Sequence, residues 1–334
     1  MRTRLVFLAL LLMSQAPQAA GVLERPEMHR FIDRMEREHG IPRAELEALF
    51  ARVETDPRVI ERITRPAEAL PWHRYRRIFV TESRIRQGID FWNRHADTLA
   101  RAEREYGVPP EIVTAIIGVE TRYGRHRGGY PVITALTTLG LDYPRRSRFF
   151  LRELEEFLLL ARSEGLDPLG VMGSYAGAMG QPQFIASSYR RYAVDFDGDG
   201  VRDLLDDTED AIGSVANYFR RHGWRPGAAV AFPAQVDEAR AAPLLEAGYK
   251  PHLPAARLSE YGVRPAAPLP TDARVALVAL EQPDGGKEHW VVLPNFYVIT
   301  RYNHSPLYAM AVYQLAEAIA RGREAEPARV AVSD

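Results

Sequence analysis

Glu120 is the first residue in the sequence whose surroundings suit acid–base chemistry. It follows residues 112–119, an almost wholly apolar stretch with a helical pattern. Desolvation and the negative end of the helix dipole both disfavour a charged carboxylate there, so both raise the pKa of its side chain. A carboxyl group that keeps its proton near neutral pH can serve as a general acid. Taken alone, however, a salt bridge to Arg122 or Arg125 is the commoner explanation for a glutamate at such a position.

An acidic loop that begins at Asp195 has the spacing of a calcium-binding site. Its first seven residues fit the EF-hand opening D-x-D-x-D-G-x. Asp195, Asp197 and Asp199 would supply carboxylate oxygens, Val201 would supply its backbone carbonyl, and the glycine at position six permits the turn. The glutamate that usually closes such a loop at position twelve is replaced by Asp206. We expect a structural Ca²⁺ here, and a solvated acidic turn is the alternative.

The amino-acid composition of the chain limits the kinds of molecule that it can be expected to bind. The chain of 334 residues is 46% hydrophobic and 26% charged, with a net charge of -1. These values are typical of a globular protein of two or three domains and give no sign of nucleic-acid binding. Seven arginines between residues 122 and 152 could face an anionic polymer or form solvated helix faces. The absence of cysteine excludes disulfides and thiolate chemistry, and none of the nine histidines shows the His-x-x-x-His spacing of zinc hydrolases.

Residues 1–20 have the features of a signal peptide for export. Arg2 and Arg4 precede the apolar run Leu5–Met13, and small residues follow as far as Ala20. The run is too short to span a bilayer, and no cysteine is available for lipid attachment. We therefore expect a periplasmic protein that is not a lipoprotein. Membrane association through a partner or an uncleaved signal is the alternative.

Glu120 and the acidic loop must be positioned by the surrounding helices and strands. The first part of the chain, residues 22–106, is predicted to be a helical domain. Helices are predicted over Met28–His39 and Ala44–Val53, followed by one long amphipathic stretch over Thr81–Tyr106.

A core domain is predicted over residues 107–227. The helix that carries Glu120 stops near Gly124, and further helices are predicted over Arg146–Ser163 and from Asp210 to His222. A glycine-rich loop and the acidic loop over residues 195–210 lie between them.

A small β-rich domain is predicted over residues 228–294. Its strands are Val275–Leu280 and Trp290–Leu293, with a turn at Asp284-Gly285-Gly286. Residues 295–322 return to the core with a helix over Ser305–Arg321, and residues 323–334 are predicted to be a frayed tail. The fold class is therefore mainly α (α+β).

Three separated motifs carry a resemblance to a known family. They are Ile116-Ile117-Gly118-Val119-Glu120-Thr121-Arg122-Tyr123-Gly124, then Tyr175-Ala176-Gly177-Ala178-Met179-Gly180-Gln181-Pro182-Gln183-Phe184, then Asn295-Phe296-Tyr297-Val298-Ile299-Thr300-Arg301-Tyr302-Asn303-His304-Ser305. In this order they resemble the lytic murein transglycosylases of the B type, and the resemblance runs from about residue 25 to about residue 321. It implies a lysozyme-like core flanked by a helical domain and a small β domain.

The resemblance also implies an activity and a mechanism. Enzymes of this family cut the β-1,4 bond between N-acetylmuramic acid and N-acetylglucosamine in peptidoglycan. Glu120 would protonate the glycosidic oxygen and then act as base on the C6 hydroxyl of the muramyl residue, giving a 1,6-anhydro product. The attacking hydroxyl belongs to the substrate, so proximity replaces the second carboxylate of ordinary glycosidases. No cofactor is needed for this chemistry.

Further site residues are implied by the same resemblance. The glycines of the second motif would let the backbone approach a bulky sugar. Arg145 and Arg146 match positions near the peptide stem, and a tyrosine position of the family is Phe149 here, which removes one hydroxyl. The substrate-binding set comprises Tyr75, Arg145, Arg146, Ser174, Gln183, Phe184, Tyr218, Tyr302, Asn303 and Tyr308.

The family closes its metal loop with an aspartate just before the next helix, which here is Asp210. The expected calcium ligands are therefore Asp195, Asp197, Asp199, Val201 and Asp210, with Asp206 and Glu209 as alternatives to the last. The expected partner is the glycan strand of peptidoglycan, together with cell-wall synthesis proteins as a further possibility, and we expect a monomer that binds no nucleic acid.

Two other functions compete with this interpretation. A muramidase-type hydrolase would use water as nucleophile and would need a second carboxylate, for which Asp142 and Asp167 are the candidates. A non-catalytic, calcium-stabilised wall-binding protein would bind peptidoglycan without releasing products. Intact motifs around Glu120 favour an enzyme.

Overall fold

The computed structural model describes residues 21–65 and 70–330, with side chains to residue 325. Contacts divide the chain into two units, the first ending at Thr55 and the second beginning at Asp56. No helix in the described ranges is both long enough and apolar enough to cross a membrane. The predicted signal peptide lies outside the described residues.

The first unit is a pair of helices preceded by a short 3-10 turn. After the turn η1 (Val22–Glu24) come α1 (Pro26–His39) and α2 (Arg43–Phe50). The apolar face of α1 meets α2 through Phe31 and Phe50, whose rings lie edge to face at 5.9 Å. Gly40 ends α1 in the left-handed conformation that glycine adopts without strain. Both helices were predicted from the sequence, and the second ends three residues earlier than expected.

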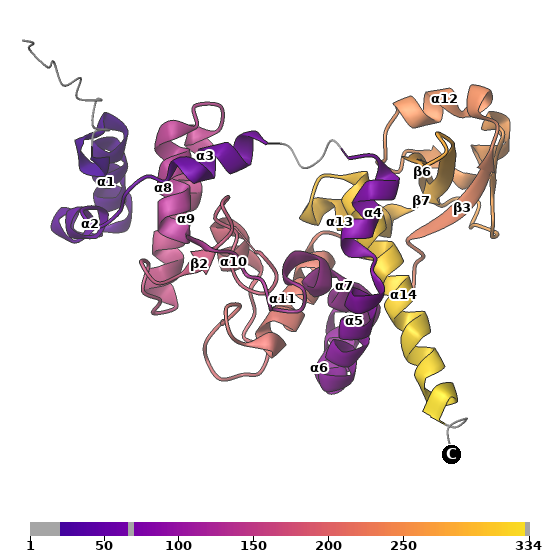
Figure 1. The fold of residues 1–334 in the computed structure, drawn as a ribbon, viewed down its shortest axis with the longest axis horizontal. Helices are drawn as coiled ribbons and strands as arrows, with labels where there is room; N and C mark the ends of the chain where they lie inside the picture. The colour runs from indigo at the N-terminus through magenta and orange to yellow at the C-terminus, as the bar shows by residue number, and fades with distance from the viewer. Residues whose placement is uncertain (1–20, 66–69, 331–334) are drawn as a thin grey trace, which may run out of the picture. The chain divides into compact units, whose positions relative to one another are not determined.

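The second unit contains most of the helices and all of the strands (Figure 1). Its longest helix, α14, packs against α4, α5, α7 and α13, while α11 packs against α6, α7 and α10. Helix α7 is therefore enclosed, and ten of its twelve residues are buried. The helices are α3 (Pro57–Thr64), α4 (Trp72–Phe79), α5 (Glu82–Arg94), α6 (Ala96–Tyr106), α7 (Pro110–Thr121), α8 (Val132–Asp142), α9 (Ser147–Ser163), α10 (Ala186–Tyr192), α11 (Thr208–Arg221), α12 (Glu238–Glu246), α13 (Pro294–Tyr302) and α14 (Pro306–Val330), with a 3-10 helix η3 (Ala255–Tyr261).

Two sequence expectations about these helices were wrong. The stretch predicted as one helix over Thr81–Tyr106 is divided between α5 and α6 at His95, which ends the first helix and begins the second. The apolar spacing continues through the break, so periodicity alone does not reveal it. The predicted frayed tail after Arg323 instead continues α14 to Val330, in a stretch rich in alanine, glutamate and arginine, which favour helix.

The β-rich part forms one antiparallel sheet of five strands in the order β4-β6-β7-β3-β5. The predicted strands are β6 and β7, which pair with Val278 opposite Trp290, and the predicted turn joins them. Helix α12 packs on β6 and buries Ala241 and Leu244 in the local core. The strands are β3 (Ala231–Val236), β4 (Leu253–Pro254), β5 (Val263–Pro265), β6 (Arg274–Glu281) and β7 (Lys287–Val292), and a separate pair is formed by β1 (Tyr130–Pro131) and β2 (Met172–Gly173).

Candidate active site

The end of helix α7 fixes the position of Glu120. The chain leaves the helix through Arg122 and Tyr123, which both have positive φ angles, 52° and 61°. Their amides close the helix by donating to the carbonyls of Gly118 and Ile117 at 3.1 and 3.2 Å. Gly118 is required because a Cβ there would lie 2.6 Å from the Tyr123 ring. Two consecutive left-handed residues other than glycine cost energy, and such strain is concentrated at functional sites.

Within the described part of the chain, Glu120 has a tyrosine partner and no basic partner. Its side chain is only partly exposed, and the Tyr308 hydroxyl donates a hydrogen bond to its Oε1 at 2.5 Å. The Arg122 guanidinium turns away and donates to Gln87 at 2.9 Å. Among the described residues neither Arg122 nor Arg125 forms an ion pair with Glu120, so the salt bridge weighed in the sequence analysis is not formed.

Burial raises the pKa of Glu120 to about 7, and the hydrogen bond from Tyr308 opposes this rise. At that pKa a large fraction of the carboxyl groups is protonated at neutral pH. Burial also raises the pKa of Tyr308 well above its ordinary value, and the negative charge of Glu120 adds to the effect. Tyr308 therefore keeps its proton and remains a hydrogen-bond donor at physiological pH.

Aromatic rings form one wall beside Glu120. Tyr302 stacks on Tyr308 with ring centroids 6.5 Å apart, and it meets Tyr218 edge to face at 4.9 Å. The Tyr302 hydroxyl donates to the carbonyl of Pro182, and the Tyr218 hydroxyl donates to that of Arg301, both at 2.6 Å. Phe184 contacts both rings. Phe184, Tyr218 and Tyr308 are buried, whereas Tyr302 is partly exposed. Because a backbone carbonyl occupies the Tyr302 hydroxyl, its exposed part is ring surface, which suits the apolar face of a sugar.

The glycine-rich loop is tied directly to the end of α7. The Thr121 hydroxyl donates to the Gln181 carbonyl at 2.8 Å and accepts from the Gly124 amide at 2.9 Å. A Cβ at Gly180, where φ is +75°, would lie 2.4 Å from the Leu204 carbonyl oxygen. Glycine is thus required at this position by a close approach inside the protein.

Two polar residues of the same loop stabilise the loop itself. The Ser174 hydroxyl accepts from the amides of Ala176 and Ala178 at 3.3 and 3.1 Å. Gln183 has a φ of 54°, and its side chain donates to the carbonyls of Arg127 and Gly180, both at 3.0 Å. Sugar contacts by Ser174 and Gln183 stay a prediction.

The remaining predicted substrate residues lie in different places. Tyr75 on α4 is buried and close enough to Tyr308 to add to the rise in its pKa. Asn303 follows α13 and is half-buried. Arg145 and Arg146 are exposed just before α9, where Arg146 lies 4.2 Å over the Phe149 ring. No contact between described residues joins these arginines to Glu120.

The acidic loop brings three of the predicted calcium ligands together. Carboxylate oxygens of Asp195, Asp197 and Asp210 lie within 4.8 Å of one another. Of the three candidates for the closing ligand, Glu209 is paired with Arg101 at 3.1 Å and Asp206 with Arg127 at 2.7 Å. The arrangement therefore favours Asp210 as the closing ligand.

Asp210 also joins the loop to α11. Its carboxylate accepts from the amides of Phe196 and Asp203 at 2.6 and 2.7 Å, so it is held between the two halves of the loop. The Asp195 carboxylate accepts from the amides of Gly198 and Gly200 at 2.8 and 2.9 Å. These amide donors hold the two carboxylates in the loop, close enough together to share a cation that prefers oxygen ligands.

A second catalytic carboxylate is not supported by the surroundings of Glu120. Burial and the Tyr308 bond account for its pKa, and no other carboxylate among the described residues contributes. A negative charge at the separation used by glycosidases would raise that pKa further. Asp142 lies exposed at the end of α8, and Asp167 accepts from the Leu169 amide in its own turn.

Thr121 and the left-handed turn at Arg122 and Tyr123 were not singled out from the sequence. A glycine inside an otherwise apolar helix, Gly118, was the available signal, because it marks close packing against the helix. The partner in that packing, Tyr123, is only five residues away.

Comparison with known proteins gives consistent matches over nearly the whole chain. Residues 24–317 match the family model described as transglycosylase SLT domain. The chain is 45% identical over 308 residues to membrane-bound lytic murein transglycosylase B of Escherichia coli K12, covering 89% of this chain and 84% of the relative.

Solved structures agree with these matches. The crystal structure of soluble lytic transglycosylase SltB1 from Pseudomonas aeruginosa is similar with a TM-score of 0.85 at 50% identity, covering 90% of this chain and 100% of that one. The Escherichia coli lytic transglycosylase Slt35 in complex with calcium is similar with a TM-score of 0.82 at 46% identity, covering 89% and 94% of the two chains. The predicted resemblance and the mainly helical fold class are thereby confirmed.

Proposed function

We propose, from the premise that this chain belongs to the transglycosylase SLT domain family, that it is a peptidoglycan lytic transglycosylase with Glu120 as its single catalytic acid and base. The observation that carries the assignment of Glu120 is its carboxyl group, which has a pKa of about 7, a tyrosine donor and no basic partner among the described residues. The comparisons support the reaction class, and the geometry supports the residue.

In the first step Glu120 acts as general acid. Its proton passes to the glycosidic oxygen as the bond to muramyl C1 breaks, and N-acetylglucosamine leaves with a free hydroxyl. The negative charge that remains on Glu120 is stabilised by the hydrogen bond from Tyr308, which is already formed.

In the second step Glu120 acts as general base. The muramyl C6 hydroxyl attacks C1, its proton returns to Glu120, and a 1,6-anhydro ring closes without consumption of water. The nucleophile is part of the substrate, so the step is intramolecular and needs no second carboxylate. In agreement with this, no carboxylate among the described residues contributes to the pKa of Glu120.

The acidic loop is the proposed site of a structural Ca²⁺. Asp195, Asp197 and Asp210 converge there, and Asp199 and the Val201 carbonyl complete the proposed ligand set. Bound calcium would neutralise the clustered carboxylates and stabilise the loop. A related enzyme is described in complex with calcium, which supports this proposal.

The proposed location is the periplasm, where peptidoglycan lies. The export signal predicted over residues 1–20 supports this location, as does the relative's description as a membrane-bound murein enzyme. The proposed partner is the peptidoglycan strand, and we propose that the enzyme works as a monomer. Contacts with cell-wall synthesis proteins stay a prediction.

The test is digestion of purified peptidoglycan followed by liquid chromatography and mass spectrometry. We expect products one water lighter than the reducing forms and resistant to borohydride. Glu120→Gln should remove them while keeping the fold and binding to sacculi. Reducible ends would instead indicate a hydrolase, and binding without any product would indicate a wall-binding protein.

A further inference from the structure

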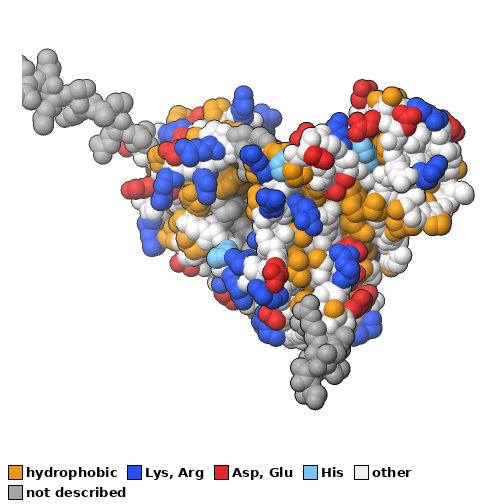
Figure 2. Space-filling model, turned by 45° about the vertical axis from the view of Figure 1, so that its right-hand side comes forward, with side chains coloured by type: hydrophobic (Ala, Val, Ile, Leu, Met, Phe, Trp, Pro, Cys, Tyr) orange, Lys and Arg blue, Asp and Glu red, His pale blue; other side chains and the backbone are white. Residues whose placement is uncertain are grey.

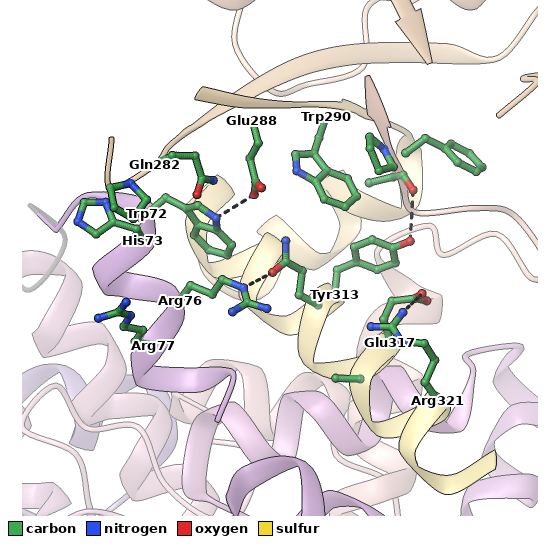
Figure 3. Close-up of a pocket in the computed structure, with 16 residues that line it drawn as sticks. Trp72, His73, Arg76, Arg77, Gln282, Glu288, Trp290, Tyr313, Glu317 and Arg321 are labelled. Atoms are coloured by element: carbon green, nitrogen blue, oxygen red, sulfur yellow. Dashed lines mark hydrogen bonds and ion pairs between the residues drawn. The ribbon is translucent and has the colours of Figure 1, made fainter. Parts of the chain in front are cut away.

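A cleft lies between α4, β3, the β6–β7 hairpin and α14 (Figure 3). Its volume is about 620 Å³, which falls within the range of small-ligand sites. None of the residues that contact Glu120 lines it. Figure 2 shows this side of the molecule, where hydrophobic side chains gather in a hollow beneath the β-rich part, with charged side chains around it.

The two sites share helices but use different faces of them. On α4, Tyr75 is buried near Tyr308, whereas Arg76 is exposed and lines the cleft. On α14, Tyr308 contacts Glu120, whereas Tyr313 lines the cleft. The cleft is therefore separate from the proposed active site.

Fixed aromatic rings form the floor of the cleft. Trp72 is 2% exposed, and its indole nitrogen donates to Glu288 at 2.9 Å. Trp290 and Tyr313 meet edge to face at 6.2 Å, and the Tyr313 hydroxyl donates to the Ala231 carbonyl at 3.2 Å. Trp72 is therefore part of the core beneath the cleft, whereas Trp290 and Tyr313 are partly exposed. The rings of these two residues offer apolar surface without losing side-chain freedom on binding, which suits sugar rings and aliphatic chains.

The lining of the cleft carries more positive than negative charge, because Arg76, Arg77 and Arg321 outnumber Glu288 and Glu317. Glu317 pairs with Arg321 at 3.3 Å, and Glu288, which keeps its charge, is held by the hydrogen bond from the Trp72 indole. Arg76 donates through its Nε to Gln314 at 2.6 Å, and the Arg77 side chain has no partner among the described residues. Figure 3 shows both guanidinium groups on the α4 side of the cleft.

The hydrogen bond between Arg76 and Gln314 orients the Arg76 side chain in the cleft. By fixing Nε against α14, it sets the plane of the guanidinium and leaves the two terminal nitrogens for a ligand. A planar fork with two free nitrogens matches a carboxylate better than it matches a neutral hydroxyl. The indole nitrogen of Trp290 is buried and has no hydrogen-bond partner among the described residues.

From these features we propose that the cleft is an accessory binding site for a carboxylate-bearing muramyl unit of peptidoglycan, on a segment other than the one being cut. The aromatic floor takes the apolar face of the sugar or peptide, and Arg76 and Arg77 take the carboxylate. The choice of ligand rests on the proposed function. Two parts of such a unit carry carboxylates, the stem peptide and the lactyl group once that peptide is removed.

The test measures binding to purified sacculi by cosedimentation in a Glu120→Gln background, so that nothing is cleaved. Arg76→Gln and Arg77→Gln should each weaken binding by about three- to tenfold, as expected for loss of a partly exposed charge-assisted contact. Arg74→Gln is the matched control, because this exposed arginine also lies on α4 but does not line the cleft.

Two further ligands identify the source of the carboxylate. Glycan strands freed of stem peptides by an amidase keep the lactyl carboxylate, and chitotetraose has none. Weaker binding of the arginine variants to stripped strands assigns the lactyl group, whereas an effect on intact sacculi alone assigns the stem peptide. Equal binding of all three variants to sacculi, or an equal loss with chitotetraose, would overturn the proposal.

A second readout separates this proposal from the catalytic one. With Glu120 intact, both cleft variants should cleave a short soluble fragment at the wild-type rate, because the cleft contributes no group to the reaction. Absence of anhydro products from every variant would refute the proposed function and leave the binding comparison interpretable. A rate loss on the short fragment would show that the arginines act at the active site instead.

Discussion

Replacing Tyr308 with phenylalanine tests how the structure controls the acidity of Glu120. The hydroxyl donates to the Glu120 carboxylate at 2.5 Å and lowers a pKa that burial has raised to about 7. A hydrogen bond to a charged group contributes about 1.5–3 kcal/mol, which corresponds to about one to two pKa units. In Tyr308→Phe the pKa of Glu120 should therefore rise by about that amount, because the charged form loses its donor.

The assay is the pH dependence of kcat/KM on a soluble muropeptide. Activity falls at alkaline pH as the general acid loses its proton, so this limb should move upward by about one unit or more in the variant. The rate at the optimum should drop by about tenfold or more, because the developing carboxylate is no longer stabilised. The ring remains to stack on Tyr302, so the fold should persist.

Tyr313→Phe is the matched control for this experiment. It removes a hydroxyl from the same helix, where the group donates to the Ala231 carbonyl at 3.2 Å, and should leave the pH profile unchanged. An alkaline limb that stays in place or moves downward in Tyr308→Phe would refute the assignment of this bond to the control of Glu120.

Three further predictions concern stability. The pKa of Glu120 is higher in the folded state than its ordinary value of 4.5, so the free energy of unfolding should fall as pH rises from about 4.5 to about 7. Glu120→Gln should remove this contribution and stabilise the protein by up to about 3 kcal/mol at pH 8. Equal melting temperatures of the wild type at about pH 4.5 and pH 8 would contradict this prediction. Added calcium should raise the melting temperature and a chelator should lower it. Asp195→Asn should weaken this response, whereas Glu209→Gln should keep it, because Glu209 is paired with an arginine. A melting temperature that changes with neither addition would exclude the metal site. Gly180→Ala should destabilise the fold by about 2 kcal/mol or more, because the new Cβ would lie 2.4 Å from a backbone carbonyl oxygen. Gly165 also has a positive φ, but a Cβ there would meet no atom within 4 Å, so Gly165→Ala should cost only about 1 kcal/mol. Equal losses of unfolding free energy in denaturant would refute the steric argument.

The sequence predicts best those helices and strands whose residues follow a simple local pattern, such as an apolar run or a turn motif. Helix α7 is apolar on nearly every face, and β6 and β7 join through a turn at Asp284-Gly285-Gly286, so all three were expected. His95 was missed because it ends one helix and begins the next without a proline or glycine. Helix α8 is almost as fully buried as α7 and was missed, because it lacks the proline and the acidic residue that mark the first turn of α7.

The site shows the same limit at the level of side chains. The family resemblance named Glu120 and Tyr308, which lie 188 residues apart, but no local pattern shows that Tyr308 donates a hydrogen bond to Glu120. The bond depends on how α14 packs against α7, and that is a property of the tertiary fold. The cleft beside Trp72 and Trp290 was missed for the same reason, because its residues come from four separate parts of the chain.

The pKa of Glu120 explains how one carboxyl group can serve both proposed steps. An acid much weaker than this would protonate the leaving oxygen poorly and hold its proton too tightly afterwards, while a stronger one would be ionised before the substrate arrived. Burial in the apolar surroundings of α7 raises the pKa, and Tyr308 limits the rise by stabilising the carboxylate. The two effects act in opposite directions on the same group, so the value of about 7 depends on both. A substrate that brings its own nucleophile then needs only this one group, which must give up a proton and take one back within a single turnover.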